Sequence, residues 1–77
     1  MRFADNEFNF YAAKTKADLA VELYKSSFVS VRAASVDDWC EKCAARIYEQ
    51  YDYKFIFDDL ETFVNELINY DFIKEIQ

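Results

Sequence analysis

The chain has 77 residues, of which 53% are hydrophobic and 19% aromatic, and its net charge is −6. This length fits one domain, residues 1–77, and nine basic residues spread among fifteen acids do not supply the clustered cations that direct binding to nucleic acid needs. Because the chain contains no Gly, Pro or His, glycine-rich phosphate loops are not expected and the commonest general base and metal ligand are missing.

The first expected elements are a strand and a helix. Residues 7–13 alternate between two faces and are rich in aromatics, which is typical of a strand. A helix is expected over residues 16–26, because Thr15 stands three residues before Asp18, close to the capping-box spacing, and an apolar stripe follows. Residues 28–32 predict either a third short strand or an apolar loop.

Two further helices are expected in the second half of the chain. Residues 36–50 follow Ser35 as a capping residue and repeat apolar side chains at helical spacing. Residues 53–57 alternate, with three aromatics on one face, and predict a strand. A third helix is expected over residues 59–70 after Asp58 as its cap, and the apolar tail at 71–77 is expected to dock on the domain.

The predicted order is therefore strand, helix, loop or strand, helix, strand, helix. This order indicates a small α+β domain, with three amphipathic helices packed on a short two- or three-stranded sheet. A three-helix bundle with extended arms is the alternative. Without Gly, any turn that needs a positive φ has to use Asn or Asp, which tolerate the left-handed region best.

The sequence Trp39-Cys40-Glu41-Lys42-Cys43 matches the W-C-x-x-C signature of thioredoxin-type oxidoreductases. A reactive cysteine needs the field of a helix N-terminus to lower its pKa, and a helix capped by Ser35 places Cys40 beyond the first turn. The chain also lacks the proline that faces the disulfide in that family. We therefore interpret both cysteines as core residues. A cap at Asp38 instead of Ser35 would reverse this interpretation.

No metal or cofactor is expected. Zinc takes four ligands, usually Cys or His, so two cysteines without histidine leave only carboxylates to complete a site within one chain. A site of four cysteines, shared between the two chains of a dimer, is the alternative. The acids Asp52, Asp58, Asp59 and Glu61 lack the spacing and the glycine of a calcium loop. We expect them to form a solvated negative surface that meets a basic partner.

The predicted contact residues combine aromatic and acidic side chains around residues 53–57, with one tyrosine from the first strand. Aromatic residues are enriched at protein interfaces, and this short chain has more of them than a core requires. The six candidates are Tyr11, Tyr51, Asp52, Tyr53, Asp58 and Asp59.

The segments KADLAVELYKSSF (16–28), DDWCEKCAARI (37–47) and DDLETFVNELINYDFI (58–73) loosely resemble small proteins of bacteriophages and mobile elements. They cover about half of the chain. The resemblance implies a role in binding and blocking a host complex, as anti-CRISPR proteins do, and it carries no catalytic residue.

The sequence therefore predicts a small acidic, non-enzymatic module that binds another protein, with a structural homodimer as the alternative and a thiol oxidoreductase as the third hypothesis. No run of 18 apolar residues occurs, so no membrane partner is expected. Two cysteines without an evident export signal predict a cytoplasmic location.

Overall fold

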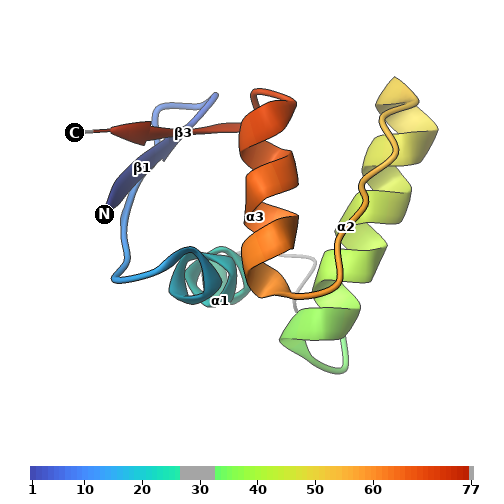
Figure 1. Ribbon diagram of the computed structural model, residues 1–77, viewed down its shortest axis with the longest axis horizontal. Helices are drawn as coiled ribbons and strands as arrows, with labels where there is room; N and C mark the ends of the chain where they lie inside the picture. Colours follow the sequence, from blue (N-terminus) through green and yellow to red (C-terminus); the bar gives the residue numbers. More distant parts are fainter. Residues whose placement is uncertain (27–32, 77) are drawn as a thin grey trace.

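The computed structural model describes residues 1–26 and 33–76, so the strand or loop expected at 28–32 lies outside the described residues. The chain order of the described elements is β1 (Arg2–Asp5), β2 (Phe10–Ala12), α1 (Lys16–Ser26), α2 (Val36–Tyr51), α3 (Leu60–Asn69) and β3 (Ile73–Ile76). The sheet lies at one end of the molecule, α3 stands between it and α2, and α1 crosses beneath them (Figure 1). The predicted α+β class is confirmed.

The sheet is antiparallel and joins the two ends of the chain, with the strand order β2-β1-β3. The central strand β1 was not foreseen, and the strand expected over residues 7–13 is confined to β2 because residues 6–9 form the hairpin turn. The tail docks as expected, but it does so by pairing as β3 with β1. The sheet buries one face, to which Phe3 and Ile73 contribute.

The three helices lie close to their predicted bounds because each begins at a side chain that caps it. Thr15 and Ser35 accept hydrogen bonds from the backbone N–H three residues later, at 3.1 Å in both helices. Asp59, one residue beyond the predicted cap, begins α3 by forming a capping box with Thr62. These contacts satisfy backbone donors that have no partner within a helix.

The core forms where the three helices meet the inner face of the sheet. Phe63 of α3 is fully buried and packs edge-on against Trp39 of α2, with ring centroids 5.8 Å apart. Trp39 in turn packs against Tyr24 of α1. The apolar stripes predicted for the helices therefore point at one another over α1, α3 and the first half of α2.

The segment at 53–57 is not a strand, which corrects the prediction. Its alternation still separates two faces, because Phe55 and Phe57 pack against Phe63 while Ile56 is 77% exposed. The backbone N–H of Ile56 donates to the Glu66 carboxylate of α3 at 3.1 Å, so the segment lies along a helix rather than beside another strand. The alternation indicates which side chains face the protein, but it does not indicate the hydrogen-bond partners of the backbone.

Two of the three residues with positive φ among those described are Asp52 and Asp71, as the absence of glycine predicts. The third is Phe8, at φ 65° in the hairpin turn, where a bulky side chain is uncommon. Asp5 holds this turn because its carboxylate accepts the backbone N–H groups of Glu7 and Asn9 at 2.9 and 3.0 Å.

Candidate functional site

Five aromatic rings from three separate segments form a stack at the end of α2, which we call the aromatic ladder. The rings of Tyr51 and Tyr53 are stacked with centroids 5.7 Å apart. Tyr70 inserts its ring between those of Tyr53 and Phe55, at 4.6 and 5.4 Å. Phe72 packs edge-on against Tyr51 and Tyr53 and at a tilt against Phe55. Offset and edge-on arrangements are the favourable geometries for aromatic pairs.

Backbone geometry explains why these rings meet. Residues i and i+2 of an extended segment point the same way, about 6.6 Å apart, so Tyr53 and Phe55 can hold a third ring between them. Tyr70 supplies it as the C-cap of α3, and its hydroxyl lies 3.5 Å from the carbonyl oxygen of Lys54. The sequence prediction therefore included Tyr51 and Tyr53, at one end of the ladder, but it did not include Tyr70 or Phe72.

The ladder is packed at one end and open at the other. Tyr51 and Tyr53 are 53% and 39% exposed, whereas Phe55 is half-buried against the core. Asp52 lies between the two exposed tyrosines in the sequence, at φ 62°, and its backbone N–H ends α2 by donating to Tyr48 at 2.9 Å. The side chain of Asp52 is exposed and is not used in this cap. The site thus presents two stacked rings beside an exposed carboxylate.

Asp58 and Asp59 lie at the other end of the same connecting segment, where they begin α3. Thr62 donates its backbone N–H to Asp59 at 2.8 Å and its hydroxyl lies 3.1 Å from Asp58. The hydrogen bond from the Thr62 backbone, and then that from its side chain, lower the pKa of Asp59. Both carboxylates therefore have a structural role, and both remain exposed.

Helix α2 adds two acids to this end that the sequence analysis did not select. Asp37 and Glu41 line a recess of about 330 Å³ together with Asp58 and Asp59. We call these four carboxylates the acidic end. Residues 51–59 run from the aromatic ladder to Asp58 and Asp59, and we call them the contact strip. Figure 1 shows this connection running back along α2 to the start of α3. Asp37 and Glu41 are distant in sequence from Asp58, so only the fold brings them together.

Tyr11 does not join the contact strip. It lies on β2, where its hydroxyl donates to Asp5 at 3.1 Å, and burial followed by this bond raises the pKa of Tyr11. The ring lines a cleft of about 550 Å³ under the hairpin, which also includes Trp39 and Phe72. Five of the six predicted contact residues therefore share one strip, and Tyr11 belongs to a different surface.

The two cysteines are free thiols on the inward side of α2. Ser35, and not Asp38, is the N-cap, so Cys40 is the fifth helical residue, and it is 1% exposed. Burial, with smaller effects from Cys43, Asp37 and Glu41, raises the pKa of Cys40 to about 12. Burial raises the pKa of Cys43 to about 11. Thiols with such values are almost entirely protonated near neutral pH, which is opposite to what a nucleophilic cysteine requires.

Comparison with known proteins finds no matching family model and no significant match among curated proteins or solved structures. Within residues 1–26 and 33–76, no group of three or more cysteine and acidic side chains is arranged to hold a metal ion. In the same part of the chain, no helix combines the length and apolar character needed to cross a membrane.

Proposed function

We propose that the chain is a small acidic, non-enzymatic module that binds another protein through the contact strip. The observation that carries this proposal is the exposed end of the aromatic ladder, where the stacked rings of Tyr51 and Tyr53 lie on either side of Asp52 in the sequence. Rigid tyrosines supply a large contact area at a low cost in side-chain entropy, and tyrosine is enriched among residues that dominate binding energy.

The chemistry of the strip favours a partner with a basic surface. An arginine guanidinium stacks on an aromatic face and also pairs with a carboxylate, and Tyr51, Asp52 and Tyr53 offer both groups within three consecutive residues. The acidic end extends the negative surface with four more carboxylates. The net charge of −6 adds long-range attraction, which accelerates encounter with a positively charged surface.

The resemblance to bacteriophage and mobile-element proteins extends this proposal to the class of target. We infer an inhibitor that occupies a basic groove on a host complex, where carboxylates stand in for nucleic-acid phosphates. A cytoplasmic location follows from this role and suits two free cysteines.

A structural homodimer is the second candidate, because exposed apolar side chains also occur far from the contact strip. Phe8 and Phe10 of the hairpin are 82% and 74% exposed. Two copies could bury these rings against each other. Size-exclusion chromatography with light scattering separates the two candidates, since a monomer at micromolar concentration supports the binding module and a stable dimer supports the structural subunit.

Paired affinity capture from the native host, with the intact chain as bait, tests the binding module. The first variant, Asp37→Asn with Glu41→Gln, removes two charges from the acidic end. The matched control, Asp18→Asn with Glu22→Gln, removes two charges from α1 and likewise alters one acid in the first turn of a helix.

We expect a protein with a basic surface to be captured by the wild type and the α1 control, and to be lost with the acidic-end variant and with Tyr51→Ala. Equal loss with both charge variants would reduce the effect to net charge alone and contradict the assignment of the strip. Unchanged capture of the partner by all of the variants would also contradict the assignment of the contact strip.

A further inference from the structure

The cleft under the β1–β2 hairpin, which the Tyr11 ring lines, has a volume of about 550 Å³. Small-molecule sites span about 300–1,000 Å³ and are lined mainly by hydrophobic and aromatic side chains, with a few polar groups that orient the ligand. The apolar lining of this cleft comes from all three helices and from the start of β3. Its aromatic members are Tyr11, Trp39, Phe63 and Phe72. The cleft therefore has the size and the lining of a ligand site.

In the part of the chain that the structure describes, the charged side chains that line the cleft are the acids Asp5 and Glu7 of the hairpin. Partial burial by itself would raise the pKa of Asp5, but hydrogen bonds from Asn9, Glu7 and Tyr11 lower it overall, so this carboxylate stays ionised. Burial, followed by the hydrogen bond and the charge of Asp5, raises the pKa of Tyr11, and the charge of Glu7 adds to this rise. Both carboxylates thus act on the same side of the cleft, which favours a cation.

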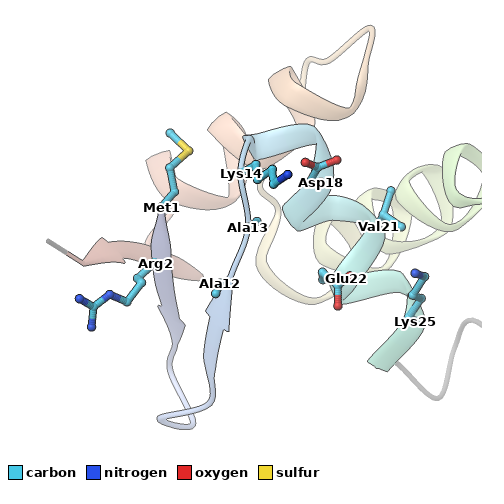
Figure 2. Close-up of a pocket in the computed structure, with 9 residues that line it drawn as sticks. All are labelled: Met1, Arg2, Ala12, Ala13, Lys14, Asp18, Val21, Glu22 and Lys25. Carbon is cyan, nitrogen blue, oxygen red and sulfur yellow. The ribbon is translucent and has the colours of Figure 1, made fainter.

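The larger groove beside α1 does not have this preference for one charge. It has a volume of about 810 Å³, and Figure 2 shows that its lining combines the acids Asp18 and Glu22 with the bases Lys14 and Lys25. Opposite charges at similar distances from a ligand largely cancel. Of these two hollows, the cleft under the hairpin is therefore the one whose charge selects a ligand.

The acids and the aromatic rings of the cleft differ in exposure. Glu7 is exposed, and no described residue donates a hydrogen bond to its carboxylate. Asp5 is half-buried, and both of its carboxylate oxygens accept bonds within the hairpin. Trp39 and Phe63, in contrast, are 5% and 1% exposed. A ligand would therefore meet buried rings at the base of the cleft and the Glu7 carboxylate at its rim, with the charge of Asp5 nearby.

We propose that the cleft under the hairpin binds a small arylalkyl ammonium ion, with its aromatic ring packed against Trp39 and Phe72 and its ammonium group paired with Glu7. An aromatic ring fits this lining better than an alkyl group, because aromatic pairs gain stability beyond the area that they bury. None of residues 51–59, all of which the structure describes, lines the cleft. The site is therefore separate from the contact strip and independent of the function proposed above.

Titration of the intact chain with 2-phenylethylammonium, followed by two-dimensional ¹H–¹⁵N NMR, tests the proposal. The chain has one tryptophan, so its indole N–H gives a single signal that reports on the cleft. Two further probes isolate the two recognition elements. The first, 3-phenylpropionate, keeps the ring but reverses the charge, and the second, 2-cyclohexylethylammonium, keeps the charge but lacks the aromatic ring.

Glu7→Gln removes the rim carboxylate, and Glu22→Gln is its matched control. Both side chains are exposed, so both variants should fold, but Glu22 lines the groove beside α1 instead of the cleft. The Asp5 carboxylate is left unchanged because it holds the hairpin turn.

We expect 2-phenylethylammonium to shift the Trp39 indole signal with a Kd on the order of 1 mM, as its small size allows. Binding of 3-phenylpropionate should be at least about tenfold weaker, and binding of 2-cyclohexylethylammonium at least about threefold weaker. Glu7→Gln should weaken binding of 2-phenylethylammonium at least about threefold, and Glu22→Gln should leave it within about twofold of the wild type.

An indole signal that does not move with up to about 20 mM 2-phenylethylammonium, well above the expected Kd, would overturn the proposal. Equal binding of the carboxylate probe would overturn the charge selection, and equal binding of the cyclohexyl probe would overturn the aromatic class of the ligand. Equal weakening by Glu7→Gln and Glu22→Gln would reduce the effect to net charge and contradict the site, as would unchanged binding to Glu7→Gln.

Discussion

Replacing Phe55 by alanine tests whether the aromatic face of residues 53–57 holds this segment to the body of the protein. Phe55 contacts Phe63, Tyr70 and Phe72, with ring centroids 5.4 to 6.3 Å apart. A fully buried Phe→Ala change costs about 3–5 kcal/mol, and Phe55 is half-buried, so a loss of about 2 kcal/mol is expected. Domains of this length have a total stability of about 4–12 kcal/mol, and the loss should lower Tm by about 8–16 °C.

Ile56→Ala is the matched control, because Ile56 is adjacent in sequence but 77% exposed. Its free energy of unfolding should change by no more than about 0.5 kcal/mol. Urea unfolding followed by far-ultraviolet circular dichroism, with thermal melts of the same samples, measures both variants. Equal destabilisation by the two changes would refute the assignment of opposite faces and would favour a paired strand in which both side chains are covered.

The remaining predictions concern the protonation of Cys40 and of Asp59. Cys40 should react with iodoacetamide at least on the order of 100-fold more slowly in the folded chain than in the urea-unfolded chain. Because folding raises the pKa of Cys40 from 9.0 to about 12, the stability that this thiol contributes is complete below pH 9 and is lost as pH rises towards 12. Thermal melts from pH 7 to 11 should show less alkaline destabilisation in Cys40→Ala, and identical slopes would contradict the burial of the thiol. Hydrogen bonds from Thr62 lower the pKa of Asp59 in the folded state, so its contribution is present above the ordinary value of 3.8 and is lost as pH falls through the lower folded value. Asp59→Asn keeps a good capping residue but should flatten the acid limb of Tm between pH 5 and 2, whereas an unchanged limb would show that another acid controls it.

The helices could be predicted because their signals are local. A capping side chain and an apolar period within one segment specify where each helix begins and which side is buried, as Ser35 and the α2 stripe show. The position of the α3 cap was one residue off because Asp58 and Asp59 are equivalent by residue type. Only the contacts of Thr62 distinguish them.

The pairing of the strands could not be predicted because its signals are distant in the sequence. The central strand β1 has four residues, and it is stabilised by pairing with β3, about 70 residues later in the chain. Residues 53–57 carry a stronger strand pattern than β1 does, yet they pack on helices. A short alternating run specifies an extended backbone with two faces, and its hydrogen-bond partners depend on the rest of the fold.

The same limit applies to the candidate site. Tyr51, Asp52 and Tyr53 were found because aromatic and acidic residues are adjacent in the sequence. Tyr70 and Asp37 were missed because they join this surface only when α2 and α3 pack together. No local pattern contained that information.

The central claim is that the contact strip binds a basic partner, and the most direct test is the association rate of the captured partner as salt rises from about 0.05 to about 0.5 M. Screening of charge steering predicts a fall on the order of tenfold for the wild type and for Asp18→Asn with Glu22→Gln. It predicts a smaller dependence for Asp37→Asn with Glu41→Gln, and Tyr51→Ala should mainly accelerate dissociation. A salt-independent association rate for the wild type, or identical salt dependence in the two charge variants, would contradict the claim.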